Sequence, residues 1–165
     1  MSFSKEHVNT EKKIRLMVLL LLSLFIYGLY NIFQPDMFPM KFVRGELKEI
    51  NENLIVGPYP TEREIIKLKK MGINEIINLM DSMSVIESRL IDEEKKLAEK
   101  YNLKYMNFPM SFTKLESKEN SDQISLLIKH ILSAKGGKIY IHCYLGRHRV
   151  GLLEKAFTKT KILSK

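Results

Sequence analysis

The chain has 165 residues, of which 45% are hydrophobic and 28% charged, and its formal net charge is +8. These values exclude a disordered or fibrous chain, and the length suits one domain of ordinary size. The single cysteine excludes an internal disulfide. Only four of the 27 basic residues precede residue 41, so the positive charge belongs mainly to the rest of the chain. Such charge favours anionic partners, including phosphorylated molecules, lipid head groups and nucleic acid.

The first predicted element is a membrane-spanning helix over residues 16–33, LMVLLLLSLFIYGLYNIF, which carries no charge. About 18 to 20 such residues suffice to cross a bilayer. A cleaved signal peptide is the alternative, but no small-x-small cleavage site follows the run. We therefore expect a short basic segment over residues 1–15, an uncleaved single-pass anchor over 16–33, a proline-broken linker over 34–41 and one domain over 42–165.

Basic residues on both sides of this run bear on its orientation in the membrane. Those before it are Lys5, Lys12, Lys13 and Arg15, and those soon after it are Lys41, Arg44 and Lys48. By the positive-inside rule, the more basic side faces the cytoplasm. The N-terminus is therefore expected in the cytoplasm, and the domain on the non-cytoplasmic side.

Strand patterns and helix patterns alternate along the rest of the chain. ELKEINENLIVG predicts a hairpin of two short strands, and INEIINL, LKYMNFP and KIYIH each predict a further strand. Between them lie helical stretches of 10 to 17 residues. This alternation predicts an α/β sandwich with a largely parallel sheet.

Capping residues predict where the helices begin. Thr61-x-x-Glu64 opens a helix that Gly72 ends, and Ser84-x-x-Glu87 opens one that runs to about Tyr101.

Two more helices are expected in the C-terminal part. One begins at Ser121 or Asp122 and ends at the pair Gly136-Gly137, and a final one begins at about Val150.

The stretch IHCYLGRHRVG, residues 141–151, holds the only cysteine at a predicted strand-to-helix junction. The first amides of a helix have no intrahelical partner and its dipole is positive there, so an anion is stabilised, including the thiolate of Cys143. Gly146 allows a backbone conformation in which successive amides point inward. Arg149 can hold two phosphate oxygens with its planar fork. These residues predict a phosphate site with a nucleophilic sulfur, without metal or cofactor. The alternative is that Cys143 is a small buried hydrophobic residue.

His142-Cys143-x-x-Gly146-x-x-Arg149 resembles His-Cys-x-x-Gly-x-x-Arg, the phosphate-binding loop of the cysteine-dependent protein tyrosine phosphatases. Upstream, LIVGPYPTEREIIKLKKMGINEIINL is similar to the opening strand, turn, helix and strand of dual-specificity phosphatases. GRHR is similar to the atypical plant-and-fungal group, some members of which cleave inositol pyrophosphates. The resemblance covers about residues 53–157.

This resemblance implies a tyrosine-phosphatase-like three-layer sandwich with a mostly parallel central sheet, here preceded by the membrane helix. It implies that Cys143 attacks phosphorus to give a cysteinyl-phosphate, that Arg149 holds the phosphate, and that His142 orients the loop and supports the thiolate. The remaining loop residues are expected to contact the substrate, and these are Tyr144, Leu145, Gly146, Arg147 and His148. Arg147 and His148 are equally consistent with a solvated rim.

The sequence departs from the family pattern after the loop arginine and in the supply of a general acid. Val150 stands where most relatives have a Ser or Thr that helps the thiolate leave the intermediate, and Phe112 stands near the position of the usual acidic Asp. The remaining candidate acids are Glu116, Glu119, Asp122 and Asp81. A leaving group that is itself a phosphate needs no acid, because its own pKa is low. Only 16 residues follow Arg149, whereas family domains usually add further helices.

The sequence thus predicts a membrane-anchored phosphatase acting on a phosphorylated protein or a polyphosphorylated small molecule. A catalytically inactive phosphate-binding module is the alternative. A rhodanese-like or arsenate-reducing thiol enzyme fits less well, because His142 and the spacing of Gly146 and Arg149 favour the phosphatase. Nucleic-acid binding has only the positive charge in its favour, since basic and aromatic residues do not interleave.

Overall fold

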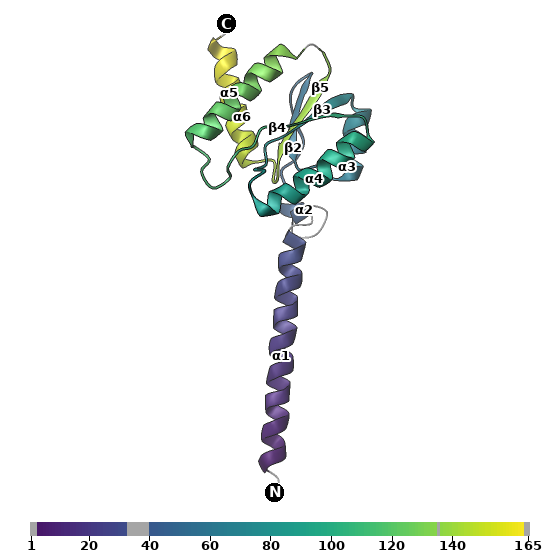
Figure 1. Cartoon of the computed structure of the whole chain (residues 1–165), viewed down its shortest axis with the longest axis vertical. Helices are drawn as coiled ribbons and strands as arrows, with labels where there is room; N and C mark the ends of the chain where they lie inside the picture. The colour runs from purple at the N-terminus through teal and green to yellow at the C-terminus, as the bar shows by residue number, and fades with distance from the viewer. Residues whose placement is uncertain (1–2, 33–39, 135, 164–165) are drawn as a thin grey trace. The chain divides into compact units, whose positions relative to one another are not determined.

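The structure is a computed structural model that describes residues 3–32, 40–134 and 136–163. The chain divides into two compact units, Met1–Phe42 and Val43–Lys165 (Figure 1).

The first unit consists mainly of α1 (Phe3–Ile32). Within the described residues, α1 is the one helix long and apolar enough to cross a membrane, over Glu11–Tyr30 with a mean hydropathy of 1.8 and no burial inside the protein. The helix begins well before the apolar run, so the predicted basic segment is helical from Phe3. Of the predicted linker, residues 34–39 lie outside the described residues, and α2 (Met40–Val43) follows them.

The second unit contains a five-stranded sheet in the order β1-β2-β5-β3-β4. The strands are β1 (Lys48–Asn51), β2 (Leu54–Pro58), β3 (Ile73–Asn78), β4 (Lys104–Asn107) and β5 (Lys138–Cys143). β1 pairs antiparallel with β2 as the predicted hairpin, and every other pair is parallel. β5 therefore lies in the centre of the sheet, and its last residue lies at the carboxyl edge, where parallel sheets bind ligands.

Helices cover both faces of this sheet, which confirms the expected α/β sandwich (Figure 1). α3 (Glu62–Lys70) and α4 (Val85–Lys100) pack on one face through a core that includes Tyr140. α5 (Lys118–Ser133) and α6 (His148–Leu163) pack on the other through a core that includes Ile141. Successive residues of β5 serve opposite faces because side chains alternate along a strand.

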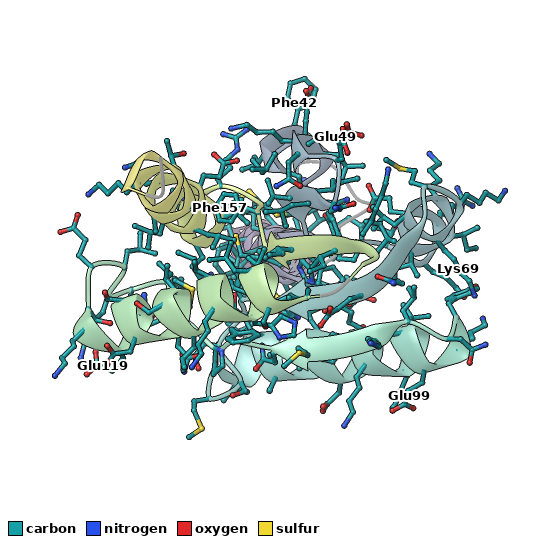
Figure 2. All side chains as sticks on the ribbon, turned by 90° about the horizontal axis from the view of Figure 1, so that it is seen from above. Phe42, Glu49, Lys69, Glu99, Glu119 and Phe157 are labelled. Carbon is teal, nitrogen blue, oxygen red and sulfur yellow. The ribbon has the colours of Figure 1, made fainter. Side chains whose placement is uncertain are left out.

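Side chains fill the spaces between the three layers, and most charged groups lie outside them (Figure 2). Phe157 of α6 is buried against the sheet, whereas Glu99 and Glu119 are exposed on the outer surfaces of their helices. This separation is what the alternating apolar and polar pattern of the sequence predicts.

The predicted cap at the start of α3 is present as a full capping box. The Glu64 carboxylate accepts from the Thr61 amide at 2.8 Å, and the Thr61 hydroxyl accepts from the Glu64 amide at 3.3 Å. Gly72 ends the segment with φ +89°, a conformation that favours glycine. At α4, Ser84 accepts from the Glu87 amide, but the Glu87 side chain does not return to it.

The predicted start of α5 at Ser121 or Asp122 is wrong, because the helix is capped by Ser117 one turn earlier. The cause is the buried Asn120, whose side chain satisfies the preceding loop by accepting from the Ser111 amide and donating to nearby carbonyls. The helix starts one turn earlier than predicted because that turn places the side-chain amide of Asn120 beneath the loop.

The C-terminal end of α5 and the start of α6 also differ from the prediction. α5 ends at Ser133, before the glycine pair, and α6 begins at His148 rather than at about Val150. Arg149 lies in the first turn of α6, as expected.

Candidate active site

Cys143 is the last residue of β5, and α6 begins five residues later. The residue is 2% exposed and belongs to the core cluster that also contains Val150 and Leu153. Among the described residues, no group of three or more His, Cys, Asp or Glu side chains could hold a metal ion.

The loop between β5 and α6 requires glycine at its centre. Gly146 has φ +67°, in the left-handed region. A Cβ there would also lie 2.7 Å from the carbonyl oxygen of Gly57 and nearer still to the Pro58 nitrogen. Both the conformation and the close packing against β2 exclude a side chain. Gly146 thus has a conformation that favours glycine, and the close packing adds a steric reason that the sequence did not reveal.

Two carbonyls of this loop accept hydrogen bonds from other segments of the chain. The Tyr144 carbonyl accepts from the Tyr59 amide at 3.1 Å, and the Leu145 carbonyl accepts from the Gly45 amide at 2.8 Å. Within the part of the chain that the structure describes, no hydrogen bond is donated by the backbone amides of residues 145–149. A run of free amides at the start of a helix is an anion-binding feature.

Arg149 is 3% exposed and its guanidinium is held at several points. Nη2 donates to one oxygen of Glu87 at 2.5 Å, and Nη1 donates to the other at 2.8 Å. Nη1 also donates to the carbonyls of Leu79 and Met110 at 3.2 and 3.1 Å. Glu87 thus occupies the edge formed by Nη1 and Nη2, and the edge formed by Nε and Nη2 is a different one.

The charge of Arg149 is stabilised despite its burial. Burial opposes the charged form, but the Glu87 carboxylate and, more weakly, the neighbouring sulfur of Cys143 outweigh it and raise the pKa of Arg149. The guanidinium is thus paired with the Glu87 carboxylate and lies near the sulfur of Cys143. This position suits an oxyanion clamp, because a fixed charge in a buried site needs no rearrangement when an anion binds.

Glu87 is a site residue that sequence reasoning assigned only to a helix cap. Its carboxylate accepts both bonds from Arg149 and a third from the Asp81 amide at 2.7 Å. The sequence signal that could have identified this role is an acidic residue at the start of a helix with an apolar face, in a fold that also contains a predicted buried arginine. Helix position alone cannot separate this role from capping.

His142 lies on the opposite face of the sheet from Cys143, completely buried. Its Nε2 is 2.6 Å from a carboxylate oxygen of Glu94, which is also fully buried, although the contact is not aligned as a hydrogen bond. The His142 ring stacks on Tyr140 and meets Tyr59 edge-on. These contacts fix the end of β5, and the predicted support of the thiolate by His142 stays a prediction.

Glu94 is the centre of a buried polar group. It accepts from Asn78 at 2.5 Å and from the Tyr105 hydroxyl at 3.3 Å. Burial, followed by the Glu94 charge, raises the pKa of Tyr59 and of Tyr105 above the ordinary tyrosine value. The two hydroxyls therefore stay protonated at any working pH and act as fixed dipoles.

The candidate acids occupy two different places. Glu116, Glu119 and Asp122 are exposed around the start of α5, and hydrogen bonds from the backbone and Ser117 lower the pKa of Glu119. A lowered pKa disfavours a general acid, which must be protonated when it acts.

Asp81 differs because it belongs to the network around Arg149. It is half-buried, its amide donates to Glu87, and its carboxylate accepts from the Met83 amide at 2.9 Å. Of the four acids, Asp81 is thus the one that hydrogen bonds connect to the loop arginine. Phe112, at the expected acid position, is 55% exposed.

The remaining side chains of the loop differ in solvent exposure. Tyr144 and Leu145 are half-buried, whereas Arg147 and His148 are exposed. The side chains of Arg147 and His148 are accessible both to a substrate and to solvent, which agrees with either interpretation of the sequence.

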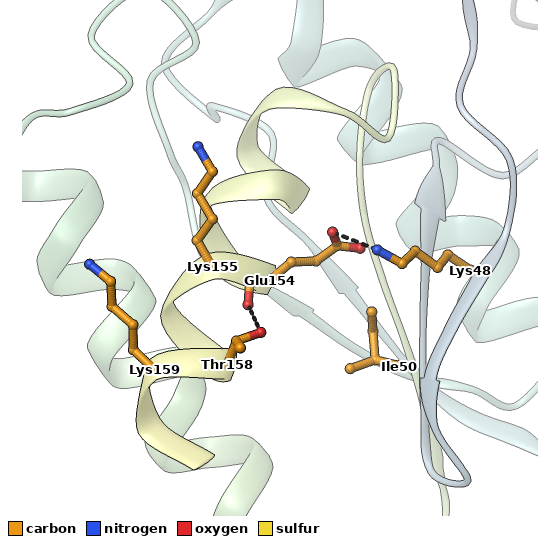
Figure 3. Close-up of a pocket in the computed structure, with 6 residues that line it drawn as sticks. All are labelled: Lys48, Ile50, Glu154, Lys155, Thr158 and Lys159. Carbon is orange, nitrogen blue, oxygen red and sulfur yellow. Dashed lines mark hydrogen bonds and ion pairs between the residues drawn. The ribbon is translucent and has the colours of Figure 1, made fainter. Parts of the chain in front are cut away.

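A separate hollow lies between β1 and α6, away from the loop (Figure 3). Its basic members are Lys48, Lys155 and Lys159, and Lys48 is paired with Glu154 at 2.9 Å. It contains no residue of the 143–149 loop and no nucleophile. This hollow is not part of the candidate active site.

The globular unit has the same fold as solved structures of cysteine-dependent, tyrosine-phosphatase-like phosphatases. No protein-family model matches the sequence, and no curated protein matches it. Solved structures do match. A DUF442 protein of Shewanella putrefaciens CN-32, assigned as a phosphatase, is 19% identical with a TM-score of 0.60, over 76% of either chain.

Two further structures carry printed functions. The core catalytic domain of the PP-IP phosphatase SIW14 from S. cerevisiae is 17% identical with a TM-score of 0.56, over 70% of this chain and 66% of that one. TpbA of P. aeruginosa, in complex with pTyr, is 13% identical with a TM-score of 0.50, over 65% of this chain and 58% of that one. At these identities the likeness establishes the fold.

Proposed function

We propose that this chain is a phosphatase that hydrolyses phosphate monoesters through a cysteinyl-phosphate intermediate. The observation that carries the proposal is the position of Cys143 at the end of β5, near the fixed guanidinium of Arg149. Cys143 directly precedes a loop in which the amides of residues 145–149 donate no hydrogen bond among the described residues. That combination supplies a nucleophile and a fixed positive environment for the phosphoryl oxygens.

The proposed reaction has two steps. In the first, the Cys143 thiolate attacks phosphorus in line, so that an S–P bond forms while the bond to the leaving oxygen breaks and that oxygen takes up a proton. In the second, water attacks phosphorus, the S–P bond breaks, and phosphate and the thiolate are released. The loop amides and Arg149 stabilise the charge of the equatorial oxygens throughout.

The acids favour a second form of this function, hydrolysis of a pyrophosphate group on a polyphosphorylated molecule, in which the leaving group is itself a phosphate. Three of the four acids are exposed charges around α5, and the pKa of Glu119 is lowered. A phosphate leaving group needs little protonation, and the net charge of +8 suits a highly anionic molecule. The function printed for SIW14 agrees with this choice, and the pTyr complex of TpbA supports phosphoprotein substrates as the other possibility.

If the reaction needs no general acid, the three exposed acids can be replaced together without a large loss of activity. In the variant Glu116→Gln, Glu119→Gln, Asp122→Asn, hydrolysis of p-nitrophenyl phosphate should stay within about threefold of wild type, because this phenol leaves without help. Glu99→Gln, an exposed change on α4, is the control. A large loss on this substrate would show that one of the three is the general acid, and Asp81→Asn tests the remaining candidate separately.

Val150 predicts slow breakdown of the intermediate. The residue is 2% exposed in the cluster that contains Cys143, so it offers the departing sulfur no hydroxyl. Val150→Thr should raise the steady-state rate by roughly 3- to 10-fold, because one hydrogen bond to the leaving thiolate is worth about 1 to 1.5 kcal/mol. Rapid-mixing kinetics would detect the change as a shorter-lived intermediate. An unchanged lifetime would refute this role.

A phosphate-binding module without turnover is the second candidate. The observation in its favour is the low exposure of Cys143, 2%, combined with the apolar Val150 behind it. Such a module would bind oxyanions through the same amides and Arg149 without forming the S–P bond.

We also propose that α1 anchors the protein in a membrane as a single span. Its length and composition support this role. The flanking basic residues favour a cytoplasmic N-terminus, and therefore a globular unit on the non-cytoplasmic side.

The experiment that tests the proposed function is hydrolysis of p-nitrophenyl phosphate by the full chain in detergent, measured beside binding of tungstate, a tetrahedral oxyanion. A phosphatase should release p-nitrophenol and be inhibited by tungstate. Tungstate binding without release would support the module. Absence of both would contradict either function.

A further inference from the structure

Gly45, in the segment before β1, lies in close contact with the candidate anion-binding loop. Its amide donates to the Leu145 carbonyl at 2.8 Å. A Cβ on Gly45 would lie 3.0 Å from the carbonyl oxygen of Gly146 and 3.2 Å from that of Leu145. Its φ is not in the left-handed region, so a side chain at Gly45 is disfavoured by the close approach of two backbones and not by the conformation of Gly45 itself.

These contacts determine which way the loop amides point. In a planar trans peptide, the C=O and the N–H of the next residue point in opposite directions. The Leu145 carbonyl shares a peptide with the Gly146 amide, and the Gly146 carbonyl shares one with the Arg147 amide. Both carbonyls lie against Gly45, so both amides are turned away from it, to the side where they have no partner among the described residues.

Arg44 connects the same segment to the neighbouring turn. Its Nη2 donates to the Tyr59 carbonyl and, at 2.9 Å, to Glu64. The Tyr59 amide in turn holds the Tyr144 carbonyl at 3.1 Å, which directs the Leu145 amide away in the same manner. The Arg44 side chain is 9% exposed, so these bonds lie largely out of water.

Glu64, which accepts a hydrogen bond from Arg44, is itself held in a fixed position. It completes the capping box of α3 with Thr61. Burial opposes its ionisation, but hydrogen bonds from the Thr61 amide and Arg44 outweigh burial and lower the pKa of Glu64. Arg44 therefore joins the loop to the start of a helix rather than to a mobile side chain.

We propose that Arg44 and Gly45 are positioning residues for the phosphate-binding loop: they hold the carbonyls of residues 144–146 on one side so that the amides of residues 145–147 face the bound oxyanion. The inference depends on the proposed function only where it predicts an effect of these residues on turnover. Oxyanion binding tests it without turnover.

The test uses the full chain with Gly45→Ala and Gly45→Val, with tungstate as the probe and calorimetry as the readout. Gly151→Ala is the matched control, because a Cβ at Gly151 meets nothing within 4 Å. We expect Gly45→Val to weaken tungstate binding at least about tenfold, as loss of a hydrogen bond to a charged group does. Gly45→Ala should weaken it less, and Gly151→Ala should not change it.

Each possible result of these measurements supports or overturns the inference. Wild-type tungstate affinity in Gly45→Val would overturn the inference. If Gly45→Val does not fold, the same affinity in Gly45→Ala and wild type overturns it, and a weakened one supports it. Arg44→Met should lower the affinity as well, while its melting temperature reports any general loss of stability. If wild type binds tungstate but releases no p-nitrophenol, the proposed function fails and the graded binding still supports the inference. If wild type does not bind tungstate, both fail.

Discussion

Replacing Cys143 with serine should abolish phosphatase activity while leaving the site able to bind an oxyanion. The serine hydroxyl is not ionised at working pH, so it cannot replace the thiolate as nucleophile, and kcat should fall by at least about 10³-fold. Serine is close to cysteine in size, and Cys143 is 2% exposed, so the packing around it should persist. Hydrolysis of p-nitrophenyl phosphate and calorimetric binding of tungstate measure the two effects separately.

Because Cys143 is the only cysteine in the chain, no other thiol can take over its role. The control is therefore internal: the variant must retain the wild-type melting temperature and bind tungstate. Under those conditions, activity near the wild-type rate would rule out a cysteine nucleophile and leave the loop as a binding feature.

Replacing Glu87 with alanine should cause the largest loss of stability of any single change at this site. The substitution leaves the guanidinium of Arg149, 3% exposed, without its counter-charge. Removing one partner of a buried ion pair costs about 3 to 5 kcal/mol, because the other charge stays buried and uncompensated. Thermal melting should show this loss. Tungstate affinity should fall with it, since the guanidinium of Arg149 loses its orientation.

Glu93→Ala is the matched control for this prediction, because Glu93 lies on the same helix in an ion pair with Arg89 at 2.9 Å. That pair is exposed, and exposed pairs contribute about 0 to 1 kcal/mol. Equal destabilisation by the two alanine variants would contradict the assigned role of Glu87. The double variant Glu87→Leu, Arg149→Met should recover much of the stability and remain inactive, since both charges are then absent.

The parts of the fold that the sequence predicted correctly are those set by local chemistry. The capping box at Thr61 and the glycine at residue 72 bound α3 as expected. The start of α5 was misplaced because Ser117 and Ser121 are equally good caps by residue type. The choice between them depends on Asn120, which hydrogen-bonds a loop nine residues away.

The same division applies to the candidate site. Cys143, Gly146 and Arg149 lie within one loop, so their spacing alone indicated an anion site. Glu87 and Gly45 reach that loop from distant parts of the chain. Each has a sufficient local explanation, a helix cap for one and a flexible connection for the other, so only the folded structure reveals their contacts with the loop.

The most direct test of the proposed function is to trap the intermediate. Wild-type protein mixed with p-nitrophenyl phosphate and quenched in acid within its first turnovers should carry one added phosphoryl group by intact mass. Peptide mapping should locate that group on Cys143. If phosphate is released at a steady rate and no such adduct forms on Cys143, the thiolate is not the nucleophile and the proposed mechanism is wrong.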